Sequence, residues 1–485
     1  MSSYKELRAK YPTFTYEGYD VKQNDKEVEI TYHFAIDNLA QFAPQWRFPA
    51  GDRQCDYSRD ETFARLIFSL GMVELVSYWK IACPPKVIIK NASLGEDQIA
   101  WWKSLYFNGL GEFYYTNGIE ENINDFMEIV PENGICENAL SLQCEADVEA
   151  AMALRNSRIK SLADGAHCMV PVGGGKDSVV SLDVLKGYKS QIHPYIINPR
   201  GATIKTVETA GMSMDDSNVI VAHRTLDSNM LELNKKGFLN GHTPFSAIVA
   251  FSAVIAAYMN DITYIALSNE SSANESTVPG STVNHQYSKS FEFERDFHEY
   301  EAVYLKSNTY YFSLLRPLSE FQIAADFAAC TDFHSIFRSC NVGSKKDIWC
   351  GHCPKCMFVW LILSPFIEQE KLCKIFGTDM AEDETMQECF DKLVGIASEK
   401  PFECVGSVNE VNAAITLTIR SMKKAGKKLP YLFGYYCGTG LYEKNLPVCE
   451  DYFRYYDTQN LLPKDFEEAL NKTLNEKLGE RAPRH

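Results

Sequence analysis

The sequence contains no hydrophobic run long enough to cross a membrane. Its most apolar segment, residues 244–259, is shorter than the roughly 20 residues that a membrane-spanning helix needs. That segment begins with a proline, as many buried helices do, so we expect a helix of the hydrophobic core. The N-terminal residues 1–14 are polar and lack the apolar centre of a signal peptide. We therefore expect a cytoplasmic protein without a membrane partner.

Positive charge is scarce as well. The chain of 485 residues has 48 Lys and Arg against 64 Asp and Glu, which gives a formal net charge of −16. Nucleic-acid-binding proteins usually present a broad basic face, so this balance argues against a nucleic-acid partner. Any anionic ligand therefore has to be held by a local site. The 15 cysteines are scattered except for one cluster, which favours reduced thiols over a disulfide framework.

Three regions of the chain differ in their hydrophobic pattern. Residues 1–150 combine a strand-like alternation at 27–35 with helical periodicity, which predicts an N-terminal α+β unit. Residues 151–366 alternate short apolar runs with helical segments, and this predicts a parallel sheet wrapped by helices. Residues 367–485 are mainly helical in pattern. We expect an α/β protein with these three domains, in which the central strands are residues 168–172, 193–198, 218–223 and 263–270.

Polar residues follow each of these central strands. In a parallel sheet, ligands bind in the crevice at the carboxyl ends of the strands. The expected strand ends carry Gly173–Ser178, Asn198, His223 and Ser268–Glu270. We therefore predict a small-molecule site along this edge of the sheet.

The first of these strand ends has the sequence GGGKDS, residues 173–178. A Walker A loop needs serine or threonine directly after Lys176, and the dinucleotide-binding fingerprint needs a third glycine where Ser178 stands. Neither motif fits. Glycines followed by a helix still suit an anion, because backbone N–H groups and the positive end of the helix dipole point toward it. Asp177 can cap the helix or bind Mg²⁺, and a plain tight turn is the alternative interpretation.

The clustered cysteines are Cys340, Cys350, Cys353 and Cys356, in a C-x9-C-x2-C-x2-C spacing. Four thiolates complete the tetrahedral coordination of Zn²⁺, and a site without an open position is structural. A [4Fe–4S] cluster also takes four cysteines, and a redox thiol pair is a third interpretation. We favour structural zinc, with His352 as a bystander or hydrogen-bond donor rather than a ligand.

The glycine loop resembles the S-G-G-x-D-S signature of the PP-loop ATP pyrophosphatases, with Gly173 in place of the first serine. This resemblance implies a Rossmann-like PP-loop (HUP-type) sheet in the central domain. It also implies that the loop binds the pyrophosphate part of ATP and leaves the α-phosphorus open to attack, so that AMP and pyrophosphate are the products. The residues implied for ATP binding are Gly173, Gly174, Gly175, Lys176, Ser178, Asn198, Asn269 and Glu270.

Several polar blocks around these motifs narrow the resemblance. They are NGHTPFSAI (240–248), LSNESSANE (267–275), VNHQYSKSFEFE (283–294), YYFSLLRPLSE (310–320) and KPFECVG (400–406). Together with the glycine loop they are similar to the UDP-N-acetylmuramoyl-L-alanyl-L-glutamate epimerases of bacterial peptidoglycan synthesis. The resemblance implies ATP-dependent conversion of the terminal L-Glu of the UDP-linked dipeptide to D-Glu through an acyl-adenylate. The implied cofactors are ATP, Mg²⁺ and structural Zn²⁺.

The same resemblance implies roles for individual side chains. Those implied for catalysis are Lys176, Asp177, His285, Glu403 and Cys404, with Asp177 also holding Mg²⁺. Those implied for substrate binding are Asn284, Lys289 and Arg316. Epimerisation needs proton exchange on both faces of the α-carbon, and the candidates for these two groups are Glu403, Cys404, His242 and His285.

Plainer interpretations stand beside these roles. Arg316 fits a surface ion pair, and His285 fits a hydrogen bond within a loop. Cys404 lies between Phe402 and Val405, where a buried apolar thiol is common.

Two other functions are compatible with the motifs. One is a PP-loop enzyme that adenylates a nucleobase precursor or tRNA, which the cysteine cluster supports and the acidic charge disfavours. The other is a nucleotide-sensing protein without turnover, which the retained Lys176, Asp177 and Ser178 disfavour.

Overall fold

A computed structural model describes residues 4–53, 56–136, 141–277, 284–479 and 483. Within them, one sheet of 11 strands runs in the order β11-β10-β7-β8-β9-β4-β2-β1-β5-β6, with β3 paired to β2. The strands are β1 (Thr13–Gln23), β2 (Glu27–Ile36), β3 (Ala40–Phe42), β4 (Gln45–Pro49), β5 (Lys86–Ile89), β6 (Glu128–Pro131), β7 (Cys168–Pro171), β8 (Ile192–Ile197), β9 (Ile220–Thr225), β10 (Tyr264–Leu267) and β11 (Tyr310–Ser313).

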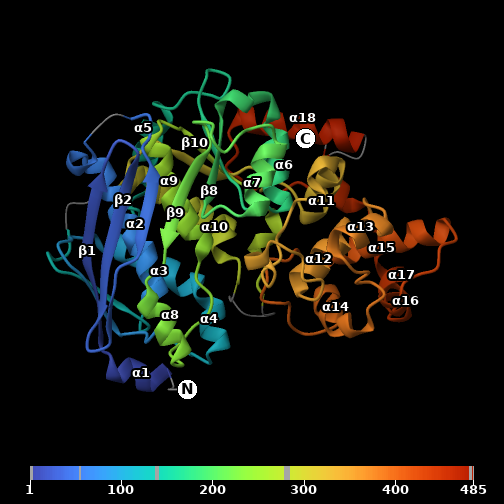
Figure 1. Cartoon of the computed structure of the whole chain (residues 1–485), viewed down its shortest axis with the longest axis horizontal. Coiled ribbons are helices and arrows are strands. Elements are labelled where there is room, and N and C mark those ends of the chain that lie inside the picture. Colours follow the sequence, from blue (N-terminus) through green and yellow to red (C-terminus); the bar gives the residue numbers. More distant parts are fainter. Residues whose placement is uncertain (1–3, 54–55, 137–140, 278–283, 480–482, 484–485) are drawn as a thin grey trace.

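Helices cover both faces of this sheet and form the whole C-terminal part (Figure 1). The helices of the first half are α1 (Tyr4–Lys10), α2 (Glu61–Trp79), α3 (Glu96–Gly109), α4 (Gly111–Thr116), α5 (Glu145–Asn156), α6 (Lys176–Val184), α7 (Gly201–Thr209), α8 (Ser228–Lys235) and α9 (Phe245–Met259). Those of the second half are α10 (Phe291–Tyr300), α11 (Glu320–Ala329), α12 (Pro354–Leu363), α13 (Gln369–Phe376), α14 (Gln387–Val394), α15 (Val408–Lys424), α16 (Tyr431–Gly438), α17 (Leu441–Asn445) and α18 (Lys464–Leu478).

The central strands confirm the expected α/β class with a mostly parallel sheet. Strands β7, β8, β9 and β10 arise where the apolar runs predict them, and all of their mutual pairings are parallel. Strand β11 extends this set beside β10. From β7 the chain proceeds to β8 and β9 on one side and later returns to β10 on the other side. The carboxyl ends of β7 and β10 therefore flank the point at which the direction of winding reverses.

Two hydrophobic cores lie on opposite faces of the sheet. In β7, Met169 belongs to the first core, whereas Cys168 and Val170 belong to the second. The same alternation holds in β10, where Ile265 and Ala266 point to different cores. Because both faces are buried, these strands have continuous apolar sequences rather than an apolar–polar alternation.

The N-terminal region shares a sheet and a core with the central region. The strand expected at residues 27–35 is present as β2, which pairs antiparallel with β1. Strand β4 continues from it and pairs antiparallel with β9, where Arg47 faces His223. The first core accordingly contains residues from Tyr4 to Tyr311. The expected boundary between residues 150 and 151 lies inside helix α5.

The second core extends through the C-terminal helices. It contains residues from Leu162 to Leu474, so it spans the expected boundary between residues 366 and 367, which lies between α12 and α13. In Figure 1 the orange helices α12 to α17 gather on the side away from the blue strands β1 and β2. Helix α11 joins the two parts, since it packs against both α6 and α12.

One local expectation was wrong. His223, expected at the end of its strand, lies inside β9, because β9 extends to Thr225 through its pairing with β4. Helix α3 ends at Gly109 without a left-handed cap, and the chain continues almost directly into α4. A side chain at Gly109 would stand 2.8 Å from the Cβ atom of Pro244, so the glycine permits close packing instead.

The apolar segment 244–259 forms the buried helix that its sequence predicts. Helix α9 packs against α2 and under β7 and β10. In the part of the chain that the structure describes, none of the helices is long and apolar enough to span a membrane.

A buried ion pair ties the N-terminal helices to the central sheet. Arg224 of β9 donates two hydrogen bonds to the carboxylate of Glu74 on α2, at 2.6 and 3.0 Å. Glu74 is fully buried and also accepts a hydrogen bond from the Trp46 indole. Removing one partner of such a pair leaves the other charge without compensation in the interior.

We expect Arg224→Met to destabilise the protein by roughly 3–5 kcal/mol, because Glu74 would remain buried without its cation. Denaturant unfolding followed by tryptophan fluorescence measures this loss. Lys235→Met is the matched control, since it removes an exposed pair with Glu232 and should cost less than about 1 kcal/mol. Equal effects of the two substitutions would contradict the role of the buried pair.

Candidate active site

A cleft of about 450 Å³ opens at the carboxyl ends of β7 and β10. This volume is within the range of roughly 300–1,000 Å³ that is usual for small-molecule sites. The cleft lies at the reversal point of the sheet, as the polar strand ends predict. The residues that line it include Gly173, Gly175, Asp177, Ser178, Arg200, Thr203, Asn269, Lys289, Arg338, Asn341, Lys355 and Cys404.

The glycine loop turns sharply between β7 and α6. Gly174 has a φ of +80°, in the left-handed region that favours glycine. A Cβ atom there would lie 3.0 Å from both the Cβ atom of Ala202 and the backbone nitrogen of Thr203. The Gly174 carbonyl oxygen accepts a hydrogen bond of 2.8 Å from the backbone N–H of Arg338. The loop is thus held between α7 and the segment that precedes the cysteine cluster.

Helix α6 begins directly after this loop. Its N-terminal cap is Gly175, which provides no side-chain cap for the first backbone N–H groups. The Ser178 hydroxyl donates to the carbonyl oxygen of Gly175 at 3.1 Å and lines the cleft. The start of the helix therefore presents backbone donors and a positive dipole end to the cleft, as an anion site requires.

Lys176 is buried beneath the loop and contacts two carboxylates. Its ammonium group forms ion pairs with Asp177 and Glu320. Burial alone would lower the pKa of Lys176, but these two carboxylates raise it above its ordinary value. Burial raises the pKa of Glu320 to about 7, helped by Asp177 and Glu270 and opposed by Lys176. The Lys176 ammonium is therefore engaged by carboxylates, while Asp177 also faces the cleft.

Four cationic side chains line the cleft in this acidic protein. Arg200 and Arg338 border the glycine loop side, and Lys289 and Lys355 come from later segments. These side chains form a local group of positive charges in a chain that is negative as a whole, and such a group suits an anionic ligand.

Cys404 lines the same cleft beside Lys289. Burial on its own raises the pKa of the Cys404 thiol, but Lys289, a hydrogen bond with His285 and the charge of Lys355 together lower it to about 6. Lys355 also donates a hydrogen bond to the Cys404 carbonyl oxygen. The thiol is therefore placed among cations and is not the isolated apolar cysteine of the plainer interpretation.

His285 connects this thiol to the N-terminal region. Its Nδ1 atom is hydrogen-bonded to the Glu112 carboxylate of α4, and the His242 ring lies 4.5 Å from the His285 ring. Burial opposes protonation of His285, but hydrogen bonds with Cys404 and Glu112 raise its pKa to about 9. Burial and the charge of His285 lower the pKa of His242 to about 4. His242, His285 and Cys404 thus belong to a single cluster.

Arg316 lies beneath the cleft, fully buried. Its guanidinium pairs with Glu294 at 2.8 Å and donates to the carbonyl oxygens of Glu270 and Lys289, each at 2.5 Å. In this arrangement it holds two cleft segments in place instead of reaching a substrate carboxylate. It is also not the surface ion pair of the plainer interpretation, because both partners are buried.

The three asparagines expected in the site lie at different positions relative to the cleft. Asn269 lines the cleft and donates to the Ser313 hydroxyl at 3.0 Å. Asn284 donates to the Ala273 carbonyl oxygen at 2.9 Å, which fixes the loop before His285. Asn198 has a φ of +52° and is hydrogen-bonded through its amide to the backbone of Arg224, so it ends β8 at the same sheet edge.

Glu403 and two other polar residues have partners of their own. Asn274 accepts a hydrogen bond from the backbone of Phe291, and Glu275 pairs with Lys400. The Glu403 carboxylate accepts a hydrogen bond from Asn341, which lines the cleft, and interacts electrostatically with Cys353 and Cys404. Glu403 therefore lies at the rim of the cleft, next to the cysteine cluster.

The sequence reasoning missed several residues of the cleft. Lys355 stands between Cys353 and Cys356, where attention falls on the cysteines, and Arg200 follows the end of β8. Glu320 is the last residue of a quoted polar block, without a motif of its own. Glu112 comes from the N-terminal region and no sequence signal indicates it.

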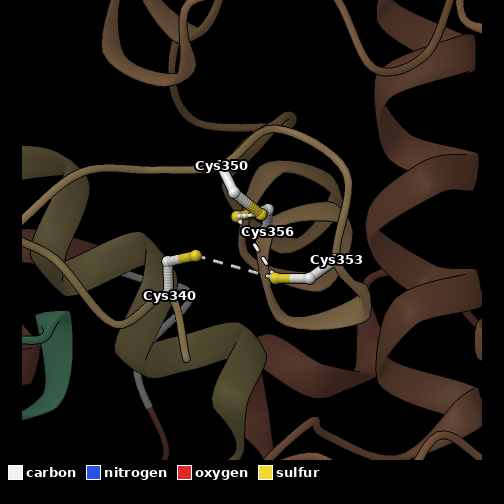
Figure 2. A group of neighbouring side chains, drawn as sticks. All are labelled: Cys340, Cys350, Cys353 and Cys356. Atoms are coloured by element: carbon white, nitrogen blue, oxygen red, sulfur yellow. Dashed lines mark hydrogen bonds between the residues drawn. The ribbon is translucent and has the colours of Figure 1, made fainter. Parts of the chain in front are cut away.

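The four clustered cysteines lie together, as Figure 2 shows. The Sγ–Sγ distances are 3.8 Å between Cys340 and Cys353, 3.7 Å between Cys350 and Cys356, and 3.5 Å between Cys353 and Cys356. Sulfurs about 2.3 Å from one tetrahedral ion are about 3.8 Å apart, so the thiols fit a single ion. In a [4Fe–4S] cluster each cysteine binds a different iron, which requires wider spacing. Gly351, with a φ of +74°, makes the turn between two of the ligands.

The cysteine cluster adjoins the cleft on two sides. Cys340 itself lines the cleft, and Arg338 before it bonds to the glycine loop. Cys353 caps helix α12, whose first turn carries Lys355 toward Cys404. His352 is 71% exposed and lies 3.9 Å from Asp383, away from the thiols. The cluster therefore supports both the glycine loop and the environment of Cys404.

A mostly parallel sheet with a polar cleft at its reversal point is typical of α/β enzymes that act on small molecules. Matches to protein families define the class of this enzyme more closely. Residues 5–314 match the MurL N-terminal domain and residues 332–430 match the MurL C-terminal domain. The chain belongs to the MurL family, and it is an epimerase.

Curated relatives share this assignment. The chain is 33% identical to a protein of Xanthomonas oryzae pv. oryzae over 72% of its own length and 73% of the relative. It is 34% identical to a protein of a Micromonospora species over 73% and 75% of the two chains. A protein of Salinispora tropica is 32% identical over 74% of each. All three are named UDP-N-acetyl-alpha-D-muramoyl-L-alanyl-L-glutamate epimerase. No solved structure matches the chain.

Proposed function

We propose that this protein converts the terminal L-Glu of UDP-MurNAc-L-Ala-L-Glu to D-Glu, for peptidoglycan precursor synthesis, and that it consumes ATP and releases AMP and pyrophosphate. One observation carries the proposal: the glycine loop and the Cys404 thiol line the same cleft. A nucleotide bound to the first and a glutamate beside the second would share one site. The names of the three relatives support the dipeptide substrate.

The need for ATP follows from the acidity of the α-carbon. Deprotonation beside a free carboxylate would place a second negative charge next to the first. Attack of the carboxylate oxygen on the α-phosphorus of ATP forms an acyl-adenylate and expels pyrophosphate. The resulting neutral carbonyl accepts the electron pair of the broken C–H bond, and later hydrolysis releases AMP.

The glycine loop and the start of α6 would bind the phosphates. Gly173, Gly175 and Ser178 line the cleft, and Arg200 and Arg338 supply positive charge. The order of the parallel strands supports a Rossmann-like PP-loop sheet, since β9, β8, β7, β10 and β11 give the order 3-2-1-4-5 in sequence numbering. Asn198 and Asn269 stand at the ends of two of these strands, where a nucleoside would lie.

Mg²⁺ would be held by Asp177, with Glu270 next to it. Hard cations such as Mg²⁺ prefer carboxylate oxygens, and they usually join one or two carboxylates to substrate phosphates. Asp177 faces the cleft and interacts electrostatically with Glu270. The ion would neutralise charge on pyrophosphate as it leaves.

The Cys404 thiolate would exchange the α-proton on one face of the glutamate carbon. His285 and Cys404 interact electrostatically, and Gln286 next to His285 donates a hydrogen bond to the Val405 carbonyl oxygen, so His285 and Cys404 would act from the same side of a substrate. Two groups that serve opposite faces have to stand on both sides of the carbon. Of the sequence candidates, His242, His285 and Cys404 therefore supply one group together, and Glu403 stays at the rim with Asn341.

We propose that the four clustered cysteines bind a structural zinc ion. The sulfur spacing suits one tetrahedral ion, and all four positions are filled by protein thiols. The ion would fix the position of the segment from Cys340 to Cys356. Arg338 lies just before this segment, and Lys355 lies within it.

The function is tested by incubating the protein with ATP, Mg²⁺ and UDP-MurNAc-L-Ala-L-Glu in D₂O. We expect pyrophosphate release that depends on the dipeptide, and deuterium at the glutamate α-carbon. UDP-MurNAc-L-Ala, which lacks the glutamate, is the matched control and should give neither signal. Pyrophosphate release that ignores the dipeptide, or that requires a nucleobase precursor or tRNA, would contradict the proposal.

Substitutions of two neighbouring glycines test whether the loop binds the phosphates of ATP. Gly174→Ala forces a left-handed alanine against Ala202 and Thr203, and we expect at least a tenfold weaker Kd for ATP, equivalent to about 1.4 kcal/mol. At Gly173 a Cβ atom meets nothing within 4 Å, so Gly173→Ser should bind ATP as tightly as the natural protein, or more tightly. Calorimetric titration measures both. Equal ATP affinity in the two variants would exclude the loop from the nucleotide site.

The metal is tested by elemental analysis of the purified protein. We expect one zinc ion per chain and no visible absorption of an iron–sulfur cluster. Cys353→Ser should lose the ion and lower the Tm, because the segment around α12 loses its crosslink. Cys389→Ser, which changes a half-buried thiol outside the cluster, should keep both. Iron with sulfide, or a full zinc content in Cys353→Ser, would contradict the zinc site.

A further inference from the structure

Glu112 is a carboxylate of the N-terminal region that reaches the cluster at the cleft. It stands in the first turn of α4 and accepts a hydrogen bond from His285 Nδ1. The segment of His285 lies against that of Cys404, because the Gln286 side-chain amide donates a hydrogen bond of 3.3 Å to the Val405 carbonyl oxygen. Glu112, His285 and the Cys404 thiol at the cleft wall are therefore neighbours, and the imidazole and the thiol interact electrostatically.

The surroundings hold these neighbouring groups in place. Lys80 of α2 donates to the carbonyl oxygen of Gly241 and, at 2.5 Å, to the hydroxyl of Thr243, which fixes the loop of His242. The His242 Nδ1 atom lies 3.3 Å from the Glu112 carboxylate. Glu112 therefore lies beside two histidines, His242 and His285.

The elements packed around the Cys404 thiol and the His285 imidazole carry further charged groups. Lys289, Lys355 and Glu403 act on Cys404 in addition to His285. Glu112 and His242 act on His285, and Lys80 lies behind His242.

These charges favour a thiolate paired with an imidazolium. Burial lowers the pKa of His285, and Glu112 counters this effect together with Cys404. Without the carboxylate, the buried imidazole would lose its proton more easily. A neutral imidazole does not stabilise a neighbouring thiolate, so Glu112 controls Cys404 through His285.

We propose that Glu112 and His285 are positioning residues that keep Cys404 as the thiolate which exchanges the substrate α-proton on one face of the carbon. This inference rests on the proposed function for the identity of the substrate. In the step itself the C–H bond breaks, an S–H bond forms, and the C–H electron pair moves into the neighbouring carbonyl. The imidazolium stays protonated and charge-paired with Glu112 throughout.

The test begins with the protein alone, without ATP or dipeptide. Iodoacetamide alkylation of Cys404, followed by mass spectrometry of its peptide across pH, reports the thiolate fraction. In the natural protein we expect the rate to rise with a midpoint near the Cys404 pKa of about 6. Glu112→Gln should move this midpoint upward by about one pH unit. His285→Gln should move it in the same direction and provides a second variant if Glu112→Gln folds poorly.

Glu96→Gln is the matched control. Glu96 is an exposed glutamate in the first turn of α3, as Glu112 is in the first turn of α4. It should leave the alkylation midpoint unchanged. A purely structural role of Glu112 would alter the Tm without moving the midpoint. An unmoved midpoint in both Glu112→Gln and His285→Gln would overturn the positioning role.

The proton-transfer role needs the full reaction. In D₂O, Cys404→Ala should retain dipeptide-dependent pyrophosphate release and lose deuterium uptake by at least about 100-fold. Undiminished deuterium uptake in this variant would overturn the role of the thiol, whereas dipeptide-dependent pyrophosphate release would still support ATP-dependent epimerisation. Absence of dipeptide-dependent pyrophosphate release in the natural protein would instead reject the proposed function, while the alkylation midpoints still decide the positioning role.

Discussion

The reversal of winding between β7 and β10 is the constraint on which the site depends. The chain leaves β7 toward β8 on one side and comes back to β10 on the other, so the loops after these two strands diverge. A cleft opens between them because no crossover helix can fill the gap. Gly173 to Ser178 follow the first strand and Ser268 to Glu270 follow the second, which brings backbone donors and carboxylates to one place.

Later segments close this cleft and set its charge. The cysteine cluster holds Arg338 against the glycine loop and Lys355 against Cys404. From the N-terminal region, α4 contributes Glu112, which would be remote without the pairing of β4 with β9 and the shared first core. An acidic protein thereby acquires a local group of cations, and one thiol within it acquires an acidic character.

Sequence patterns predicted a feature correctly where residues close together in the chain determine it. Strands β7 to β10, the buried helix α9 and the cysteine spacing follow from short-range periodicity and ligand geometry. They failed where a partner decides the outcome. His223 lies inside β9 because the pairing with β4 extends that strand. Arg316 lies beneath the cleft because Glu294 neutralises its charge in the interior.

The sequence alone determined the α/β class, the edge of the sheet that carries the cleft and the family resemblance, because all three depend on local runs of residues. Only the tertiary structure decided which ionisable groups meet. Glu112 and Cys404 are almost three hundred residues apart, so the separation in the chain contains no information on their contact with His285. Protonation depends on distance and burial, and both are properties of the folded chain.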